Sequence, residues 1–234
     1  MSRGQVGVAP GTTTLKLPDG SSVALADWID DKMYGCVQFN DGQSAPVEAF
    51  ASGRSQTIPG GVRVQTRVDT NIPRNGDSGL PKDWEMLVYG IGIKFTRAFR
   101  GDALGSSVPP ILTNFSDPTR LRTIFEIDRV CSMSFEYNNK SYSQGTMSDY
   151  PAGNGYSVFA TTASFELAQN GITSPRDRVA LVLPIHMREN LGFKCAFQPE
   201  AALIINQPAS DANAALAHVD VKTYLYGLVK RTVV

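Results

Sequence analysis

Apolar and polar residues alternate with a period of two in several segments of the chain, which is the pattern of half-buried β-strands. The clearest examples are the segments 62–69, 129–138 and 192–198. The residues expected to face a core are Val62, Val64 and Val68 in the first segment, Cys131, Met133, Phe135 and Tyr137 in the second, and Phe193, Cys195 and Phe197 in the third. The opposite faces are mostly polar, so these strands are expected to have one face in solvent.

Residues 86–96 form a longer apolar segment that contains two glycines. Alternation places Leu87, Tyr89, Ile91, Ile93 and Phe95 on one face of a strand, and Gly90 and Gly92 on the other. Because glycine has no side chain, another chain segment is able to approach closely at such a face. We therefore expect a close contact over the two glycines.

Residues 179–185 (VALVLPI) are apolar on both faces, which is typical of a strand in the centre of a sheet. Three more strands are predicted at 155–163, 201–206 and 218–232. The full set of predicted strands is roughly 62–69, 86–96, 129–138, 155–163, 178–186, 192–198, 201–206 and 218–232. The 21 glycines and 14 prolines fit short strands joined by turns.

Short helices are predicted in the connections between strands. Asp117 is suited to cap a helix over 117–128, with Pro118 in its first turn, and Ser210 is suited to cap one over 210–218. A further helical segment is predicted at 22–31. The rest of 1–59 is polar and glycine-rich, with one hairpin-like stretch.

Together these elements predict an all-β protein, an eight-stranded antiparallel jelly-roll sandwich with short helices in its connections. The domain division is an N-terminal arm or extension at 1–59 and a jelly-roll domain at 60–234. A single roll is favoured because the eight predicted strands suffice for one. A compact double roll stays open as an alternative, and it requires further strands from residues 12–52.

Composition and charge narrow the function classes. With 42% apolar and 19% charged residues, the chain is of globular type. The 22 basic residues balance the 22 acidic residues, so the basic surplus of a typical nucleic-acid-binding domain is absent. Residues 1–30 contain only Arg3 and Lys16 as cations, so a basic, genome-binding arm is not expected.

Other features of the sequence bear on where the protein works. No window is apolar enough for a membrane-spanning helix, and the first residues lack the apolar run of a secretion signal. Cys36, Cys131 and Cys195 are far apart in the chain, which predicts reduced thiols and no disulfide framework.

The segment NGDSGLP (75–81) contains the tetrapeptide that surrounds the nucleophile of chymotrypsin-like serine proteases. A triad of that type has the chain order His, Asp, Ser, whereas His186 and His218 both follow Ser78. Turn-forming residues also bracket Ser78. We therefore interpret the segment as a polar surface turn, with neither histidine in hydrogen-bond reach of Ser78.

Other catalytic or metal sites have little support. Cys195 and His186 are close enough in sequence to meet across a hairpin, but Cys195 is in line with two core phenylalanines, so we expect a packed thiol. The polar segment 69–77 carries Asp69, Asn71, Asn75 and Asp77, but without the spacing of a calcium loop. We predict turns there, and no catalytic, cofactor-binding or metal site anywhere in the chain.

Four tyrosines suggest one alternative, a carbohydrate-binding platform. They are Tyr137, Tyr142, Tyr150 and Tyr156. In β proteins, however, aromatic residues more often fill cores or subunit contacts.

With the strands laid out, the chain resembles the jelly-roll major capsid proteins of tailless icosahedral bacteriophages. Three segments carry the resemblance: an early strand, a TN-x-P…LP connection and a long apolar strand (62–95), a strand followed by a Tyr-x-x-Gly turn and a Pro-Ala-Gly-Asn-Gly loop (135–155), and the closing strand VDVKTYLYGLVKRTVV (219–234). Many such proteins contain two fused jelly rolls and are longer, whereas eight strands here suffice for one.

The resemblance implies a non-enzymatic structural protein of the virion, made in the host cytoplasm, that assembles with copies of itself into an icosahedral shell. It further implies minor capsid, penton or spike proteins as partners, and contact with a genome or an internal membrane, but no cofactor and no small-molecule substrate. The contact surfaces expected are 1–59, 70–84 and 143–155. Alternatives are a carbohydrate-binding jelly-roll module of a viral spike or fibre, and a hydrolase that uses Ser78 or Cys195.

Overall fold

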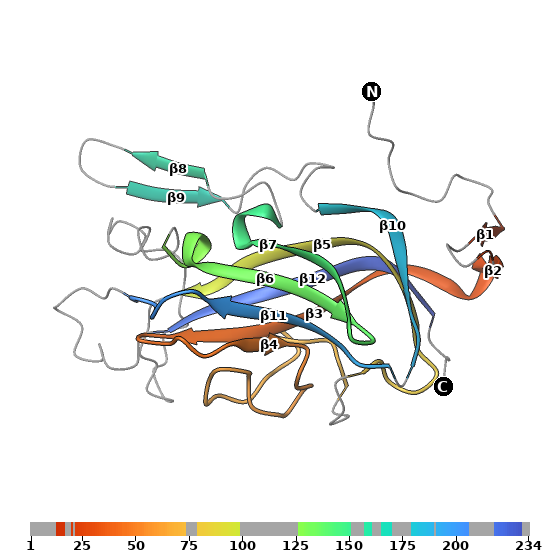
Figure 1. The fold of residues 1–234 in the computed structure, drawn as a ribbon, viewed down its shortest axis with the longest axis horizontal. Coiled ribbons are helices and arrows are strands. Elements are labelled where there is room, and N and C mark those ends of the chain that lie inside the picture. The colour runs from red at the N-terminus through yellow and green to blue at the C-terminus, as the bar shows by residue number, and fades with distance from the viewer. Residues whose placement is uncertain are drawn as a thin grey trace.

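The computed structural model describes residues 13–16, 20, 22–73, 79–98, 126–150, 157–160, 165–169, 179–189, 191–205 and 218–230 (Figure 1). This part of the chain is predominantly β and contains two four-stranded antiparallel sheets. The two sheets lie one over the other (Figure 1).

The first sheet, called sheet I, has the strand order β10 (Val179–Met187), β5 (Glu85–Ala98), β12 (His218–Lys230) and β3 (Trp28–Asn40). The second, sheet II, has the order β4 (Val47–Ala49), β11 (Phe193–Pro199), β6 (Cys131–Tyr137) and β7 (Lys140–Thr146). Two short pairs accompany them, β1 (Thr14–Lys16) with β2 (Ser22–Ala24), and β8 (Ser157–Ala160) with β9 (Phe165–Gln169). The short helical elements are η1 (Leu25–Asp27), η2 (Met147–Asp149) and residues 126–130.

The main core lies between the two sheets. Sheet II contributes the alternating residues of β6 and β11 that the sequence pattern predicted, from Cys131 to Tyr137 and from Phe193 to Phe197. Sheet I contributes residues such as Val37, Phe39 and Val221. The rings of Phe39 and Phe197 meet edge to face across the two sheets, with 5.9 Å between their centroids. Such aromatic contacts stabilise beyond the area that they bury.

Strand β5 has two register shifts against β12, and one of them changes which residues face the main core. Its register with β12 shifts between Tyr226 and Gly227, so that Tyr89 is passed over in the ladder. As a result Ile91, Ile93 and Phe95 face the main core as predicted. Leu87, in contrast, belongs to a second buried cluster with Trp28 and Leu228. The prediction that Leu87 and Tyr89 share the face of Ile91 is therefore wrong, because a β-bulge reverses the alternation.

Residues 28–49, which the sequence analysis placed in an N-terminal extension, supply one strand to each sheet. β3 pairs with β12 along its whole length, and β4 pairs with β11. The helix predicted at 22–31 is wrong, since Ser22–Ala24 form β2 and β3 begins at Trp28. The charged run from Asp30 to Lys32 lies on the exposed part of β3, which hid the apolar alternation that follows it.

The segment 50–73 between β4 and β5, called the 50–73 connection, lies along the free edge of β3. The side-chain amide of Asn71 accepts a hydrogen bond from the Tyr34 N–H at 2.9 Å and donates one to the Lys32 carbonyl at 2.7 Å. The Gln38 N–H donates to the Pro59 carbonyl at 2.9 Å. An edge strand otherwise presents such groups to other chains, so the connection protects this edge.

The strand predicted at 62–69 is wrong, because these residues form bends, an isolated bridge at Val64 and a turn within the connection. The polarity of the segment is inverted as well. Val62 is 92% exposed and Val64 and Val68 are also exposed, whereas Gln65 and Asp69 are buried. Polar side chains therefore face sheet I, and the apolar ones face solvent.

β10 is an edge strand of sheet I, so the prediction that VALVLPI lies in the centre of a sheet is wrong. Its pairing with β5 shifts register between Ala180 and Ile185. Val182, in the irregular stretch, is 94% exposed, while Ile185 and Met187 are buried.

The remaining predicted elements have mixed outcomes. Residues 201–205 form no strand, which contradicts the strand predicted at 201–206 for those positions. Only the end of the helix predicted at 117–128 is described, within helical residues 126–130, and 210–217 lie outside the described residues. The described helical segments are too short to cross a membrane.

Gly227 allows β12 to approach β5 at the bulge, which leads to a first prediction. A Cβ atom at this position would lie 2.0 Å from the Leu87 carbonyl oxygen. We expect Gly227→Ala to lower the free energy of unfolding by more than about 2 kcal/mol, measured by urea denaturation.

Gly42→Ala is the control. Gly42 has a positive φ, of 73°, and no atom lies within 4 Å of the position that a Cβ would take there, so only the backbone cost of about 1 kcal/mol is expected. Equal losses in the two variants would contradict the steric explanation.

Candidate functional site

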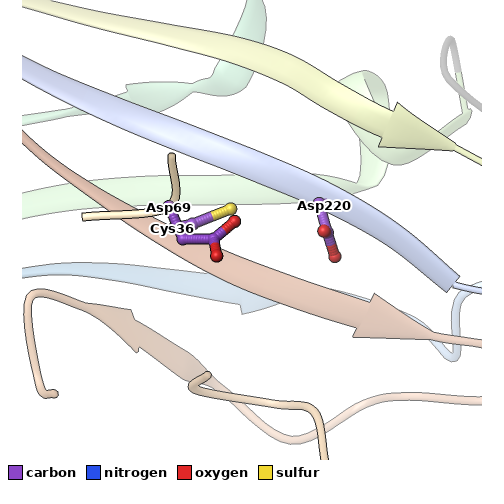
Figure 2. Close-up of side chains that lie close together, drawn as sticks. All are labelled: Cys36, Asp69 and Asp220. Carbon is purple, nitrogen blue, oxygen red and sulfur yellow. The ribbon is translucent and has the colours of Figure 1, made fainter. Parts of the chain in front are cut away.

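A buried group of polar side chains lies where the 50–73 connection crosses sheet I. Cys36 of β3 and Asp220 of β12 come from neighbouring strands, and Asp69 comes from the connection (Figure 2). All three residues are buried, and one ligand atom of each lies within 4.8 Å of the others. One thiol and two carboxylates so close together are a possible metal-ligand set, which must be tested against their surroundings.

Arg63 already occupies the space between the two carboxylates. Its guanidinium binds Asp69 through two hydrogen bonds, of 2.8 and 2.9 Å, and binds Asp220 through a third, of 2.6 Å. A metal ion held by both carboxylates would have to displace this cation. Because two-point binding of a guanidinium to a carboxylate is strong, we interpret the group as an ion-pair cluster.

The thiol is equally unsuited to a metal. Burial, followed by the negative charge of Asp220, raises the pKa of Cys36 to about 12. Without a cation beside it the thiol is therefore protonated near neutral pH, so a metal would have to displace this proton as well as Arg63. The residues present are better suited to the ion pairs that they form than to a metal centre.

The electrostatics of Asp69 show how firmly the cluster is held. Burial alone would raise the pKa of Asp69, but hydrogen bonds from Arg63 and Thr66 outweigh it and keep the pKa below its usual value. The backbone N–H and the hydroxyl of Thr66 donate to Asp69 at 2.8 and 2.9 Å. Asp69 thus closes a turn of the connection and, through Arg63, fastens that turn to β12.

A second charged group lies at the other end of sheet I. His186 Nε2 and Glu85 Oε2 are 2.8 Å apart, and Lys230 Nζ lies 3.4 Å from Glu85 Oε1. The ring of Trp28 lies beside His186, with 6.2 Å between centroids. Burial would raise the pKa of Glu85, but hydrogen bonds from His186 and Lys230 keep it low. His186 is therefore engaged by a carboxylate on a neighbouring strand.

The structure does not bring the sequence-predicted catalytic pair together. Cys195 is fully buried in β11 of sheet II, whereas His186 belongs to β10 of sheet I. Burial raises the pKa of Cys195, and that of Cys131 to about 12, so neither thiol is an activated nucleophile. Ser78 lies outside the described residues, so its predicted position in a surface turn is not tested.

The tyrosines predicted as an alternative carbohydrate platform do not form one in the described part of the chain. Tyr137 and Tyr150 are buried, and each hydroxyl is engaged: Tyr137 accepts a hydrogen bond from the Arg188 N–H, and Tyr150 bonds with Ser143. Tyr142 is exposed at the surface of β7. Tyr156 lies outside the described residues, as do Asn75 and Asp77 of the polar segment.

Sequence reasoning missed Arg63 and Asp220, although both carry a weak signal. Asp220 interrupts the apolar residues Val219 and Val221 in a predicted strand, and a charge in such a place is usually paired. Its partners were hidden because Arg63 is far away in the sequence, in a segment that looked like a strand.

Comparison of the chain with protein-family models, with curated proteins and with solved structures finds no match. Conclusions about its function therefore depend on the fold and on the residues themselves.

Removing Arg63 tests the ion-pair cluster. In Arg63→Met the side chain keeps its aliphatic stem, but two buried carboxylates lose the cation between them. We expect the free energy of unfolding at pH 7 to fall by about 3–5 kcal/mol, measured by urea denaturation. Arg67→Met, an exposed position in the same connection, is the control and should change stability by less than about 0.5 kcal/mol.

The dependence on pH gives this variant a distinct signature. With the pKa of Asp69 lowered, its stabilising contribution is present above the unfolded-state pKa of about 3.9 and is lost as pH falls through the folded-state pKa. Without Arg63, burial and repulsion raise the carboxyl pKa values, so the variant should gain stability relative to the wild type as pH falls from 7 to 4. A stability difference that is constant over this range would contradict the assignment.

Proposed function

We propose that the chain is a jelly-roll capsid protein, a non-enzymatic structural protein of the virion that assembles with copies of itself into an icosahedral bacteriophage shell. The observation that carries this proposal is the nested order in which the strands of sheets I and II pair.

All eight strands of sheets I and II take part in this nested order. The first and the last of them along the chain, β3 and β12, pair with each other. Between these in the sequence, β4 pairs with β11, then β5 with β10, and then β6 with β7. A long two-stranded ribbon that is closed at the β6–β7 hairpin and rolled up produces this order. The pairs then alternate between the two sheets, as in a double-sheet jelly roll. The remaining strands are additions to this arrangement.

Jelly rolls occur in viral capsid proteins and in lectin domains, so the fold alone leaves both classes open. The burial of Tyr137 and Tyr150 weakens the carbohydrate-binding alternative, since neither ring is free to stack on a sugar. The buried thiol of Cys195 likewise weakens the cysteine-hydrolase alternative. The resemblance of residues 62–95, 135–155 and 219–234 to capsid proteins of tailless phages adds support for a shell.

The exposed valines of the 50–73 connection also suit a subunit of a shell. Val62, Val64 and Val68 are exposed, as is Val182 on the edge strand β10. Apolar residues exposed in groups on a folded surface commonly mark contacts with other proteins. Minor capsid, penton or spike proteins, an internal membrane and the genome are further proposed contacts of such a shell.

Assembly of the purified full-length chain tests the proposal. We expect the sedimentation velocity to show large oligomers or closed particles as the protein concentration rises, and negative-stain microscopy to show shells or shell fragments. The chain should also be the main protein band of particles from its source.

A monodisperse monomer at the highest concentration, together with absence from such particles, would overturn the proposal. Binding on a glycan array by a chain that does not self-associate would instead favour the carbohydrate-binding alternative. Labelling of Ser78 by a fluorophosphonate probe, lost in Ser78→Ala, would favour the hydrolase alternative.

A further inference from the structure

The outer face of sheet I carries a group of like charges beside the ion-pair cluster. Lys94 of β5 lies directly opposite Lys222 of β12 in the strand register. Lys32 of β3 lies opposite Tyr226, on the other side of β12. Like charges placed directly across a ladder destabilise a sheet, so this arrangement requires a compensating interaction.

Three tyrosines lie among these lysines. Tyr34 and Tyr224 are opposite each other, with 6.1 Å between ring centroids, and the rings of Tyr224 and Tyr226 stack at 5.9 Å. Lys32 Nζ lies 5.5 Å from the centre of the Tyr224 ring, and Lys222 Nζ lies 5.1 Å from that of Tyr34. The rings are partly exposed. We call Lys32, Lys94, Tyr34, Tyr224 and Tyr226 the lysine–tyrosine face.

The charges of this face are only partly compensated within the chain. The Lys222 ammonium donates a hydrogen bond to the Val68 carbonyl. Cation–π contacts contribute about 0.5–1 kcal/mol at exposed sites. Across the described residues, the ion pairs formed by lysines involve Lys194 and Lys230 and not Lys32 or Lys94. Burial, and then the charge of Lys32, lowers the pKa of Lys94.

A complementary acidic pair lies in the helical segments that flank sheet II. Asp128 is in the helical segment before β6, and Asp149 is in η2 after β7. Burial, and then the charge of Asp149, raises the pKa of Asp128, so the two carboxylates are close. Asp149 accepts hydrogen bonds from the N–H and the hydroxyl of Thr146, at 2.8 and 2.9 Å. Neither carboxylate forms an ion pair with a cation of the described residues.

We propose that the lysine–tyrosine face is a docking surface for a second copy of this chain, and that it receives the Asp128–Asp149 pair of that copy. This inference rests on the proposed function, and it names the surfaces through which neighbouring subunits meet. The charge argument is direct. Among the described residues of a chain with 22 basic and 22 acidic residues, like charges without ion pairs lie in two separate places, and a second copy supplies the opposite charge to both. Tyrosine is also enriched at protein interfaces.

Nucleic acid is the less suitable occupant of the same face. Base stacking on a protein requires free aromatic faces. Here the Tyr224 ring is contacted by Lys32 and Tyr226, and the Tyr34 ring by Lys222. The chain also has no net positive charge.

A charge-swap experiment on the full-length chain tests the inference. Lys32→Glu/Lys94→Glu makes the basic face acidic, and Asp128→Lys/Asp149→Lys makes the acidic pair basic. Each double variant alone should need at least about tenfold more protein to assemble, measured by sedimentation velocity and light scattering. An equimolar mixture of the two, and the quadruple variant, should assemble near the wild-type concentration, because both again present opposite charges.

Lys16→Glu/Lys82→Glu is the matched control, since it changes net charge equally at exposed lysines outside the face. It should assemble like the wild type. Circular dichroism verifies that each variant is folded. Because Asp149 also caps η2, Asp128→Asn/Asp149→Asn gives a milder test that keeps the hydrogen-bond acceptors, and it too should weaken assembly.

The outcomes separate this inference from the proposed function. If the wild type assembles and the folded Lys32→Glu/Lys94→Glu variant assembles equally well, the docking surface is wrong while the capsid function stands. The docking surface would also be wrong if neither the equimolar mixture nor the quadruple variant recovered assembly. A third contrary outcome is an assembly defect of Lys32→Glu/Lys94→Glu that appears only when nucleic acid is added, since the face would then bind nucleic acid. If the wild type stays a monodisperse monomer and is absent from particles of its source, the capsid function itself fails.

Discussion

The pairing of β3 with β12 is the constraint on which the rest of the structure depends. Both strands are 13 residues long and pair along their whole length without a shift. This ladder joins segments near the two ends of the described chain. The other strands of sheets I and II therefore lie between β3 and β12 in the sequence. β12 also pairs with β5 on its other side, which makes it one of the two inner strands of sheet I. Contacts so distant in sequence are slow to form, and they are available only once most of the chain is present.

The buried ion-pair cluster depends on that ladder and completes it. Asp220 is carried by β12, and Arg63 and Asp69 by the connection that covers the edge of β3. Burying such charges is costly, and well-packed apolar residues would often be as stable. What the charges add is a defined position for the part of the connection around Val62, Val64 and Val68, whose valines face solvent. In this way a polar anchor holds the 50–73 connection in place while its valines remain exposed.

The strands differ in how well the sequence pattern predicted them. β6 and β11 were predicted well, because they lie inside sheet II with one face in the core, and that arrangement produces clean alternation. β7 was missed, although the pair Asn138 and Asn139 that precedes it is a signal for a hairpin. Both residues have positive φ, as the two-residue turn of a hairpin requires. β3 was missed because Asp30, Asp31 and Lys32 lie on its exposed part. The failure at 62–69 has a different cause: the segment alternates, but tertiary contacts bury its polar residues, and no local pattern reveals Asp220 as their partner.

Prediction of functional residues from the sequence has the same limit. Ser78, Cys195 and the tyrosines were candidates because of their residue types, which are nucleophilic or often bind ligands. Burial, however, makes Cys195, Tyr137 and Tyr150 structural residues. The lysine–tyrosine face was invisible in the sequence, since Lys32, Lys94 and Lys222 meet only through the order of three strands. The outer face of sheet I thus has two parts, which follow each other along the length of β12. At one end the chain covers the outer face with its own connection and supplies the counter-charges itself. Beyond that end, Lys32 and Lys94 form no ion pair with any residue that the structure describes. A balanced chain with like charges together on its surface is electrostatically suited to contact another copy of itself.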